Sequence, residues 1–474
     1  MANKKYHIWS IGCQMNIADS QRLASELEKR NYRFTPHEKE ADIIVLNTCV
    51  VRQQAEDKAY GKLTSLKPLK SRTNGGPIIG LMGCMVGVRN PAPLRKKVPW
   101  VDVFLPPSEP GPLLAYLDGK AWDADAYFHE VKTRNMLNTL VNEASINHQV
   151  ILPAHEKNHL VTAHVPIIYG CDHVCSFCII PHRRGVERSR MVGEIANEVH
   201  SLVAQGVKQV TLLGQIVDRY GYTIPDGPRL QDLLYMLNEI EGLERIRFLT
   251  SHPNYMTNEI LDAVANLPKV MEQIEVPVQA GNNEVLERMR RGYTVEQYRE
   301  LIYRIRDRIP KPAIHTDIIV GFPGETEAQF MDTYDLLAEL KLDKAHLARY
   351  SPRPNTTSAR RYPDDVPEEE KKRRHKALNE QMMEVSTEIN ASYLDTTQEV
   401  LVEEKHKSKW KGRTRTNKLV FFDDPRDRKG DLVNVQITYT GPWSMQGVPT
   451  DLPPPVRNDL INPFETVTTV AIVP

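Results

Sequence analysis

Three cysteines fall within eight residues of the sequence, close enough to hold one small metal centre. They are Cys171, Cys175 and Cys178, in the spacing C-x3-C-x2-C directly after a predicted strand. Thiolates are soft ligands that select iron–sulfur clusters or zinc. Because no fourth ligand follows at zinc-finger spacing, zinc and three inert buried cysteines are the weaker alternatives. A four-iron cube with only three protein ligands leaves one iron open to a small molecule.

The other three cysteines are far apart in the sequence but share one setting. Cys13, Cys49 and Cys84 each follow the end of a predicted strand. The carboxyl ends of parallel strands meet at one edge of a sheet, where ligands bind. A second cluster with three thiolates is therefore one interpretation, and three unrelated core cysteines are the other.

The elements that must position these cysteines alternate between strands and helices. The first hundred residues predict strands over 6–11, 42–48, 77–83 and 101–105, and helices over 19–30 and 55–69. This order indicates a small doubly wound α/β domain. Residues 121–157 are polar and weakly periodic, which is typical of a linker or an irregular insert.

Six more strands predict a partial (βα)6 barrel. They cover 163–169, 209–213, 245–249, 273–278, 315–320 and 345–350, with helical patterns such as 193–205, 230–241 and 294–308 between them. A charged helix follows over 368–390, and its Lys371–Arg374 run is best explained as a solvated face. Strands over 399–404, 418–422 and 432–439 then predict a small C-terminal β-barrel, and 451–455 reads as an extended tail.

Composition limits the classes of protein that fit. The 474 residues are 41% hydrophobic and 26% charged, which is ordinary for a globular protein. Lys+Arg and Asp+Glu both count 61, so contact with nucleic acid requires a local basic patch. No apolar run has the length of a signal peptide or a membrane span, and we expect a cytoplasmic protein whose cysteines bind metal. No P-loop or dinucleotide fingerprint supports a nucleotide triphosphatase or a nicotinamide enzyme.

The motifs around the cysteines resemble those of the radical S-adenosylmethionine (SAM) methylthiotransferases. The matching segments are Gly12–Asn16, Asn47–Arg52, Gly83–Met85, Tyr169–Pro181, Arg184–Arg190, Leu213–Gln215, Ser251–Pro253, Pro277–Gly281, Arg291–Thr294, Asp317–Thr326 and Tyr350–Ser351. Gly-Cys-Gln-Met-Asn at 12–16 is closest to the MiaB-type tRNA enzymes. One departure is the segment 214–218, which reads Gly-Gln-Ile-Val-Asp where MiaB-type proteins usually have Gly-Gln-Asn-Val-Asn.

The resemblance extends from Tyr6 to about Tyr439 and implies three domains. These are a methylthiotransferase N-terminal domain over 4–120, a radical SAM core over 157–389 and an RNA-binding TRAM barrel over 392–460. It implies two [4Fe-4S] clusters: a SAM cluster on Cys171, Cys175 and Cys178, and an auxiliary cluster with bound sulfur on Cys13, Cys49 and Cys84. The implied reaction is methylthiolation of C2 of N6-isopentenyladenosine at tRNA position 37, with SAM, a one-electron reductant and a sulfur donor.

Alternatives remain for the substrate and for catalysis itself. The same chemistry could act on threonylcarbamoyladenosine tRNA or on a ribosomal protein. A protein of another class, a non-catalytic iron–sulfur protein that binds RNA, would share the cysteines and the barrel. Cleavage of SAM to 5′-deoxyadenosine in the presence of a reductant separates the enzyme from the binder.

Five further residues are candidates for the SAM site: Phe177, Arg184, Gln215, Gln279 and Asp317. Phe177 could pack on the adenine or shield the cluster from water. Arg184 belongs to a group with Arg183, Arg188 and Arg190 that could hold the SAM carboxylate or an RNA phosphate, or pair with Glu187. The other three lie near the carboxyl ends of barrel strands, where barrel active sites lie; strand-end capping is their alternative role.

A basic segment marks the C-terminal barrel as the RNA-binding part. Between 405 and 422 there are seven basic residues, no acidic residue and an interleaved Trp410. An extended chain would place the lysines at 405, 407, 409 and 411 on one face. The candidate RNA contacts are Lys407, Lys409, Lys411 and Arg413, and a plain solvated face is the alternative.

Overall fold

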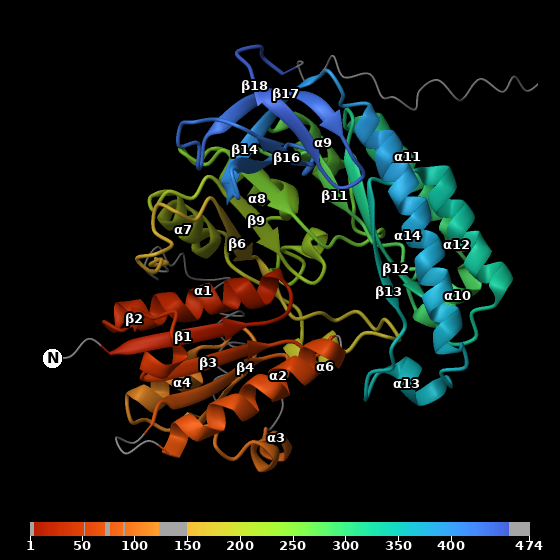
Figure 1. Ribbon diagram of the computed structural model, residues 1–474. Coiled ribbons are helices and arrows are strands. Elements are labelled where there is room, and N and C mark those ends of the chain that lie inside the picture. Colours follow the sequence, from red (N-terminus) through yellow and green to blue (C-terminus); the bar gives the residue numbers. More distant parts are fainter. Residues whose placement is uncertain (1–3, 52, 72–75, 89–90, 123–148, 455–474) are drawn as a thin grey trace, which may run out of the picture. The chain divides into compact units, whose positions relative to one another are not determined.

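A computed structural model describes residues 4–51, 53–71, 76–88, 91–122 and 149–454 (Figure 1). The chain divides into two compact units. Unit 1 contains Met1–Val174, Cys178–Leu233 and Arg353–Thr356, and unit 2 contains Cys175–Phe177, Leu234–Pro352 and Thr357–Pro474. Most of the expected linker over 121–157 lies outside the described residues.

Unit 1 begins with a five-stranded parallel sheet in the order β2-β1-β3-β4-β5. Its strands are β1 (Lys5–Ser10), β2 (Arg33–Phe34), β3 (Ile43–Thr48), β4 (Ile78–Gly83) and β5 (Val103–Leu105). The connections carry α1 (Gln14–Lys29), η1 (Glu38–Glu40), α2 (Gln53–Leu66), η2 (Lys67–Ser71) and α3 (Ala92–Lys97), and α4 (Gly111–Leu117) follows the last strand. This is the predicted doubly wound domain.

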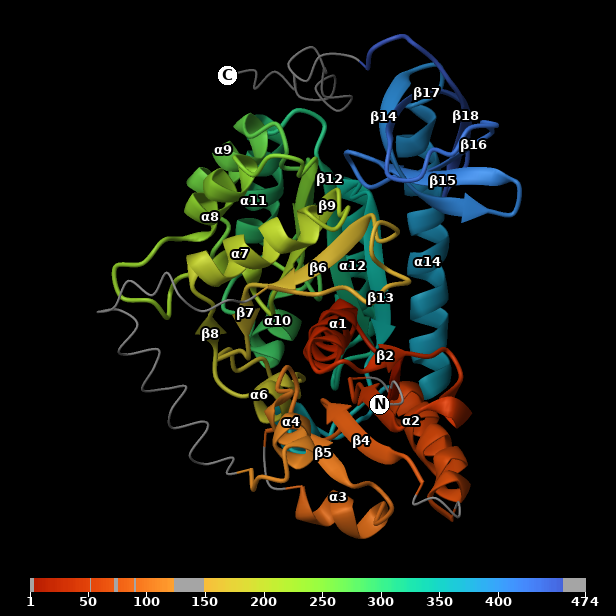
Figure 2. The same ribbon diagram turned by 90° about the vertical axis from the view of Figure 1, so that its left-hand side faces the viewer.

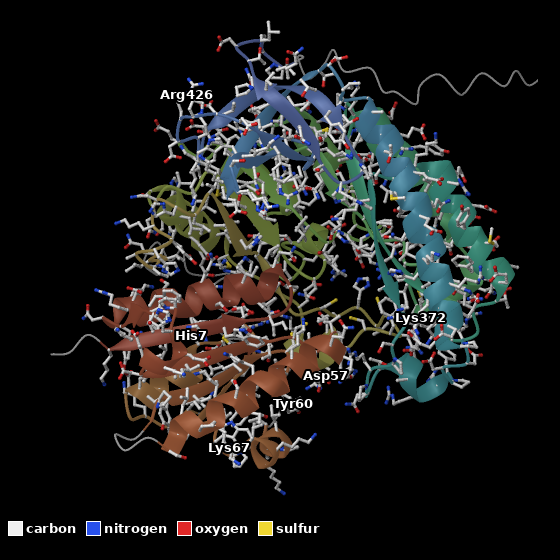
Figure 3. All side chains as sticks on the ribbon, viewed as in Figure 1. His7, Asp57, Tyr60, Lys67, Lys372 and Arg426 are labelled. Carbon is white, nitrogen blue, oxygen red and sulfur yellow. The ribbon has the colours of Figure 1, made fainter. Side chains whose placement is uncertain are left out.

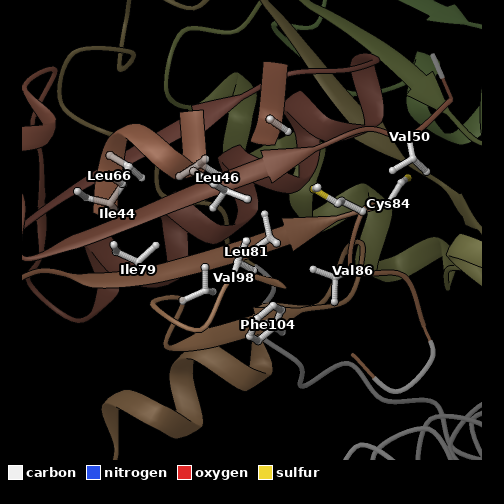
Figure 4. Close-up of a cluster of buried hydrophobic side chains, with 14 of the residues drawn as sticks. Ile44, Leu46, Val50, Leu66, Ile79, Leu81, Cys84, Val86, Val98 and Phe104 are labelled. Carbon is white, nitrogen blue, oxygen red and sulfur yellow. The ribbon is translucent and has the colours of Figure 1, made fainter. Parts of the chain in front are cut away.

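Alternating apolar side chains let the sheet bury both of its faces. On β3, Ile43 and Val45 pack with Leu23 of α1, whereas Ile44 and Leu46 pack on the opposite face (Figure 4). Each such fully buried aliphatic side chain contributes roughly 1.5–3 kcal/mol. Helices α1 and α2 therefore cover opposite faces, and the carboxyl edge between them stays available for a site.

The rest of unit 1 starts the second run of parallel strands. Strand β6 (Thr162–Pro166) pairs in parallel with β9 (Gln209–Leu213). The predicted strand over 163–169 is wrong in its length, because the chain leaves β6 after Pro166 and β7 (Ile168–Tyr169) pairs antiparallel with β8 (Arg188–Ser189). The helices here are α6 (Ile180–Arg184), α7 (Val192–Val203) and η3 (Val217–Arg219), and α8 (Leu230–Asn238) follows.

Unit 2 continues with β10 (Arg245–Phe248), β11 (Gln273–Glu275), β12 (Ala313–Val320) and β13 (Lys344–Arg349), of which β11, β12 and β13 pair in parallel. The helices are α9 (Asn258–Asn266), α10 (Asn283–Met289), α11 (Val295–Arg308), α12 (Glu327–Leu340), α13 (Thr357–Arg361) and α14 (Glu368–Ala391) (Figure 2). Capping boxes at Thr294 and Thr326 fix the starts of α11 and α12.

The C-terminal part of unit 2 is a closed barrel in the order β14-β15-β16-β18-β17. Its strands are β14 (Thr397–His406), β15 (Lys409–Thr414), β16 (Leu419–Phe422), β17 (Leu432–Thr440) and β18 (Met445–Pro449). Strands β15 and β18 were not predicted from the sequence. Apolar side chains such as Val402, Val420 and Ile437 fill the barrel interior. Arg426, labelled in Figure 3, lies on the loop after β16 and pairs with Asp424.

No helix in the described part of the chain has the length and apolar character needed to cross a membrane.

Candidate functional site

The structure brings Cys13, Cys49 and Cys84 together at the carboxyl edge of the N-terminal sheet, and we call them the N-terminal triad. Cys13 caps the start of α1, Cys49 follows β3, and Cys84 follows β4. The charge of Cys13 acts on Cys49, and the charges of both act on Cys84. Figure 4 places Cys84 beside Val50 and Val86, at the end of the buried core. Three soft donors thus lie on one edge of one sheet.

Two glycines allow the strand ends to approach this closely. A Cβ on Gly12 would lie 2.4 Å from Oδ1 of Asn16 and 2.8 Å from Cβ of Cys49. A Cβ on Gly83 would lie 2.5 Å from Oδ1 of Asn47, and both glycines have positive φ angles. The space beside the cysteines therefore exists only because both positions lack a side chain.

A buried amide pair supports the same edge. Asn16 Nδ2 donates to Oδ1 of Asn47 at 2.8 Å and to the Thr48 carbonyl at 3.1 Å. Asn47 Nδ2 donates in return to the Asn16 carbonyl at 2.8 Å. Neither asparagine was predicted as a site residue, although both stand in the cysteine motifs. Their reciprocal bonds fix the start of α1 against the end of β3.

Burial disfavours the charged form of two of these thiols, Cys49 and Cys84, when no metal is bound. It raises the pKa of Cys84 to about 11, and it raises the pKa of Cys49 despite the N–H of Val51, which donates to its Sγ at 3.4 Å. Metal ligation requires thiolates and releases their protons. A soft metal centre is therefore the partner that makes this donor set stable as anions, and the residues fit an iron–sulfur cluster.

Arg184, expected at SAM, lies at the N-terminal triad within unit 1. Its side chain is buried, hydrogen-bonds with Cys84, and places Nη1 3.4 Å from Oδ2 of Asp19. Burial alone would lower the pKa of Arg184, but the charges of Cys84, Asp19 and Cys13 raise it above the ordinary value. Its proposed contact with SAM stays a prediction.

Its neighbours form internal ion pairs. Arg190 donates to Glu198 at 2.6 Å and to the Pro166 carbonyl at 2.6 Å, and both side chains are buried. Glu187 accepts from Arg219 at 2.9 Å. Within unit 1, Arg190 therefore holds α7 to the end of β6.

The three cysteines of the C-x3-C-x2-C loop, here called the loop triad, are divided between the two units. Cys171 and Cys178 belong to unit 1, and Cys175 belongs to unit 2. In unit 2, Nη1 of Arg291 donates to Sγ of Cys175 at 3.2 Å, and the backbone N–H of Ser176 donates to the Met289 carbonyl at 2.9 Å. Arg291 stands in the motif 291–294 but was not predicted as a site residue. The hydrogen bond of Arg291 and that of Ser176 fix the position of Cys175 within unit 2.

The remaining predicted SAM residues lie in both units. Phe177 is half-buried in unit 2, and Gln215 is half-buried in unit 1 directly before the buried Ile216. Gln279 and Asp317 are neighbours in unit 2, where the N–H of Gln279 donates to the Asp317 carbonyl at 2.9 Å. Gln279 has a φ of 76°, a strained value for a residue other than glycine.

A polar cluster on strands β11, β12 and β13 was not predicted. It consists of Glu275, His315 and His346, whose ligand atoms lie within 4.8 Å of one another. Arg247 donates to Oε1 of Gln273 at 2.9 Å, which turns the Gln273 amide nitrogen toward Nδ1 of His315 at 3.1 Å. A neutral His315 then carries its proton on Nε2 and has no lone pair there to bind a metal. The cluster is therefore a hydrogen-bonding site.

The basic segment of the C-terminal barrel is not one extended face, and that prediction is wrong. β14 and β15 form a hairpin that pairs His406 with Lys409, and Lys407 lies in its turn with a φ of 57°. Lys409 donates to Gln446 at 2.7 Å, Lys411 to Glu404 at 2.6 Å and Arg413 to Glu403 at 3.1 Å. Their contact with RNA stays a prediction.

Two other basic residues of this segment hold the barrel to the remainder of unit 2. Arg415 donates to Glu272 at 2.8 Å, and Lys418 pairs with Asp343 at 2.6 Å. Fully buried Arg245 donates to the Arg413 carbonyl at 2.7 Å. Some of the basic residues counted in the sequence therefore form internal ion pairs and hydrogen bonds.

Trp410 is not available to stack on RNA. It packs in the barrel core, and its Nε1 donates to the carbonyls of Asp424 and Arg426 at 3.1 and 3.0 Å. Tyr439 and Trp443, near the turn between β17 and β18, are instead 55% and 56% exposed. These two aromatic side chains are the better candidates for base stacking.

Comparisons with known proteins cover every part of this architecture. Family models match at 165–337 (Radical SAM superfamily), 5–106 (Uncharacterized protein family UPF0004) and 391–449 (TRAM domain). A radical SAM methyltransferase structure, TsrM from Kitasatospora setae with cobalamin and a [4Fe-4S] cluster, aligns with a TM-score of 0.53 at 15% identity, over 76% of this chain and 77% of that one. This likeness confirms the radical SAM fold.

Relatives that match this chain over more than nine-tenths of its length show which family it belongs to. A tRNA-2-methylthio-N(6)-dimethylallyladenosine synthase of Roseiflexus sp. (strain RS-1) is 44% identical over 94% of this chain and 89% of its own length. A protein of the same name from Dehalococcoides mccartyi (strain ATCC BAA-2266 / KCTC 15142 / 195) is 42% identical over 93% of this chain and 97% of its own. The chain therefore belongs to the family of the tRNA-2-methylthio-N(6)-dimethylallyladenosine synthases, which are radical SAM methylthiotransferases.

Proposed function

We propose that this enzyme methylthiolates C2 of N6-isopentenyladenosine at position 37 of tRNA. The observation that carries the proposal is the presence of two separate cysteine triads in one radical SAM chain. One radical SAM cluster suffices for SAM cleavage, so a second set of three thiols needs a second task. Holding the sulfur that enters the product is a task suited to an open iron.

The loop triad is proposed to hold the [4Fe-4S] cluster that binds SAM. When bound, this cluster and SAM supply the 5′-deoxyadenosyl radical that removes hydrogen from C2. Arg291 supports the assignment, because its guanidinium is buried and hydrogen-bonded to Cys175. Its role is to hold that sulfur in place.

The N-terminal triad is proposed to hold the auxiliary [4Fe-4S] cluster and the sulfur bound to it. Gly12 and Gly83 leave the space, and the Asn16–Asn47 pair holds the strand ends in register. Cys49 and Cys84 are buried at this edge, and Cys13 is exposed. A one-electron reductant and a sulfur donor complete the proposed set of partners.

The substrate is proposed to be tRNA that carries the isopentenyl group, rather than a ribosomal protein. A TRAM domain and exposed aromatic side chains on the C-terminal barrel support RNA. An isopentenyl group adds five carbons, so an apolar pocket can discriminate it by a few kcal/mol. We place the reaction in the cytoplasm, where thiols stay reduced.

An anaerobic reaction with SAM, sulfide, dithionite and tRNA tests the proposal. Nucleoside mass spectrometry should detect the 2-methylthio base only when the tRNA carries N6-isopentenyladenosine. Unmodified tRNA, threonylcarbamoylated tRNA and ribosomal protein are the comparison substrates. Equal turnover of unmodified and isopentenylated tRNA would contradict recognition of the isopentenyl group by an apolar pocket. Turnover of ribosomal protein alone would show that the enzyme methylthiolates a protein instead of tRNA.

Iron counting tests the two clusters separately. The reconstituted enzyme should hold about eight irons per chain, and alanine at either triad should leave about four. Loss of the loop triad should abolish SAM cleavage, whereas loss of the N-terminal triad should leave it largely in place. An N-terminal triple variant that keeps all its iron would show that the auxiliary cluster does not exist.

A further inference from the structure

Two buried guanidinium groups lie beside the N-terminal triad. The side chains of Arg184 and Arg353 are only 3% and 6% exposed, and both residues belong to unit 1 with the triad. A buried cation is costly unless negative charge lies close to it. The hydrogen bonds and ion pairs of the two guanidinium groups therefore show which negative charges stabilise each of them.

The guanidinium of Arg184 contacts both a carboxylate and a sulfur. It hydrogen-bonds with Cys84 and donates to Oγ of Ser108 at 3.2 Å. Both of its Nη atoms lie 3.4 Å from Oδ2 of Asp19. Oδ1 of Asp19 is buried and has no hydrogen-bond partner among the described residues. Asp19 thus offsets much of the charge that Arg184 brings to the triad.

The positive charge of Arg353 is less fully neutralised by a carboxylate, and its side chain hydrogen-bonds to the backbone next to Cys49. Its Nε donates to the Val51 carbonyl at 3.0 Å, and the N–H of Val51 donates to Sγ of Cys49 at 3.4 Å. The carboxylate paired with it, Glu56, is 3.8 Å away, a longer separation than that between Arg184 and Asp19. Its buried Nη2 has no hydrogen-bond partner in the described part of the chain. This guanidinium keeps an unused donor and much of its positive charge.

We propose that Arg184 and Arg353 are positioning residues that raise the reduction potential of the cluster held by the N-terminal triad. The inference rests on the proposed function, because it requires that cluster. Three thiolates make the cluster anionic, and one-electron reduction adds another negative charge. Buried cations stabilise the reduced form more than the oxidised form, because their field is weakly screened. Asp19 must have the opposite effect.

The test isolates the auxiliary cluster in the full-length chain. Alanine replaces all three cysteines of the loop triad, and the protein is reconstituted anaerobically with iron and sulfide. Iron per chain is counted, and a potentiometric titration with dithionite is followed by electron paramagnetic resonance. The variants are Arg353→Gln, Arg184→Gln, Asp19→Asn and Arg353→Lys. Arg30→Gln is the matched control, since Arg30 lies 17 residues after Cys13, or about 25 Å along α1.

Arg353→Gln and Arg184→Gln should each shift the midpoint potential to more negative values, because each removes one buried positive charge beside the cluster. Asp19→Asn should shift it to more positive values. Arg353→Lys, which keeps the charge, and Arg30→Gln should leave the potential near that of the parent. If either single variant at the Arg184–Asp19 pair fails to fold, the double variant removes both charges and should return close to the parent value.

A merely structural role predicts another pattern. Variants at Arg184, Arg353 and Asp19 would all lose iron or broaden the signal, with no opposite signs. Unchanged potentials in chains that keep their iron would overturn the inference and leave the proposed function standing. A parent that binds no iron at the N-terminal triad would overturn both.

Discussion

Alanine at Gly83 should disrupt the N-terminal triad without touching a cysteine. The new Cβ would lie 2.5 Å from both Oδ1 of Asn47 and the Thr48 carbonyl, so these atoms must separate by roughly 1 Å to reach ordinary contact. The carbonyl cannot retreat freely, because it accepts from the N–H of Cys84 at 2.9 Å. A φ of 98° adds backbone strain. We expect the steric clash and the backbone strain together to destabilise this edge of the sheet by roughly 2–5 kcal/mol.

The assay is iron per chain in the variant that lacks the loop triad, measured after reconstitution and gel filtration. Gly83→Ala should retain less than half of the parent's iron. Gly61→Ala is the control: no atom lies within 4 Å of its Cβ, and alanine in the exposed middle of α2 should stabilise the helix by about 1 kcal/mol. Full iron retention by Gly83→Ala, with an unchanged spectrum, would refute the packing argument.

Three further predictions concern unit 2. Replacing Lys407, Lys409, Lys411 and Arg413 by Gln should weaken tRNA binding and reduce its salt slope by about one per lost contact, measured by filter binding; an unchanged slope would assign them to a solvated face. Trp443→Ala should cost about 1–3 kcal/mol of tRNA affinity if one base stacks on it, and Leu452→Ala, equally exposed, should cost nothing. Burial and the charge of Asp317 raise the pKa of Glu275 to about 7 from 4.5, so the folded chain loses stability as pH rises through this window. Glu275→Gln should therefore stabilise unit 2 against urea by up to about 3 kcal/mol at pH 8 and little at pH 5; equal gains at both pH values would contradict this.

Strand positions were predictable wherever apolar runs were long. Strand β9 matches its predicted bounds, and β12 and α14 differ from theirs by only one or two residues. The start of α1 was predicted five residues late, because the polar residues of its first turn hide the helical period; one of them, Asn16, bonds to the end of β3. β15 was missed because its outward residues are basic and its inward residues include Gly412 and Thr414. Tertiary contacts, rather than local preference, define these two elements.

The candidate site divides in the same way. Spacing and strand order were enough to bring the N-terminal triad together, because parallel strands leave their carboxyl ends at one edge. The partners of charged side chains were not predictable. Arg184 lies next to the loop triad in sequence, and only the fold reveals that its guanidinium reaches Asp19 and Cys84. A long charged side chain places its charged end well away from its own backbone, so sequence proximity does not identify its contact.

The contacts of the basic segment 405–422 could not be predicted from the sequence for the same reason. A count of charges in sequence cannot separate a lysine that faces solvent from one that holds two parts of the fold together. Arg415 and Lys418 pair with carboxylates of unit 2, and Trp410 supports the barrel from within, so none of the three is available to RNA without loosening the barrel. We therefore expect RNA to contact side chains that the barrel leaves exposed, such as Lys407 in the hairpin turn and the aromatic pair Tyr439 and Trp443. A backbone charge contact and base stacking from separate hairpins suit a single-stranded loop, the part of a tRNA that presents position 37.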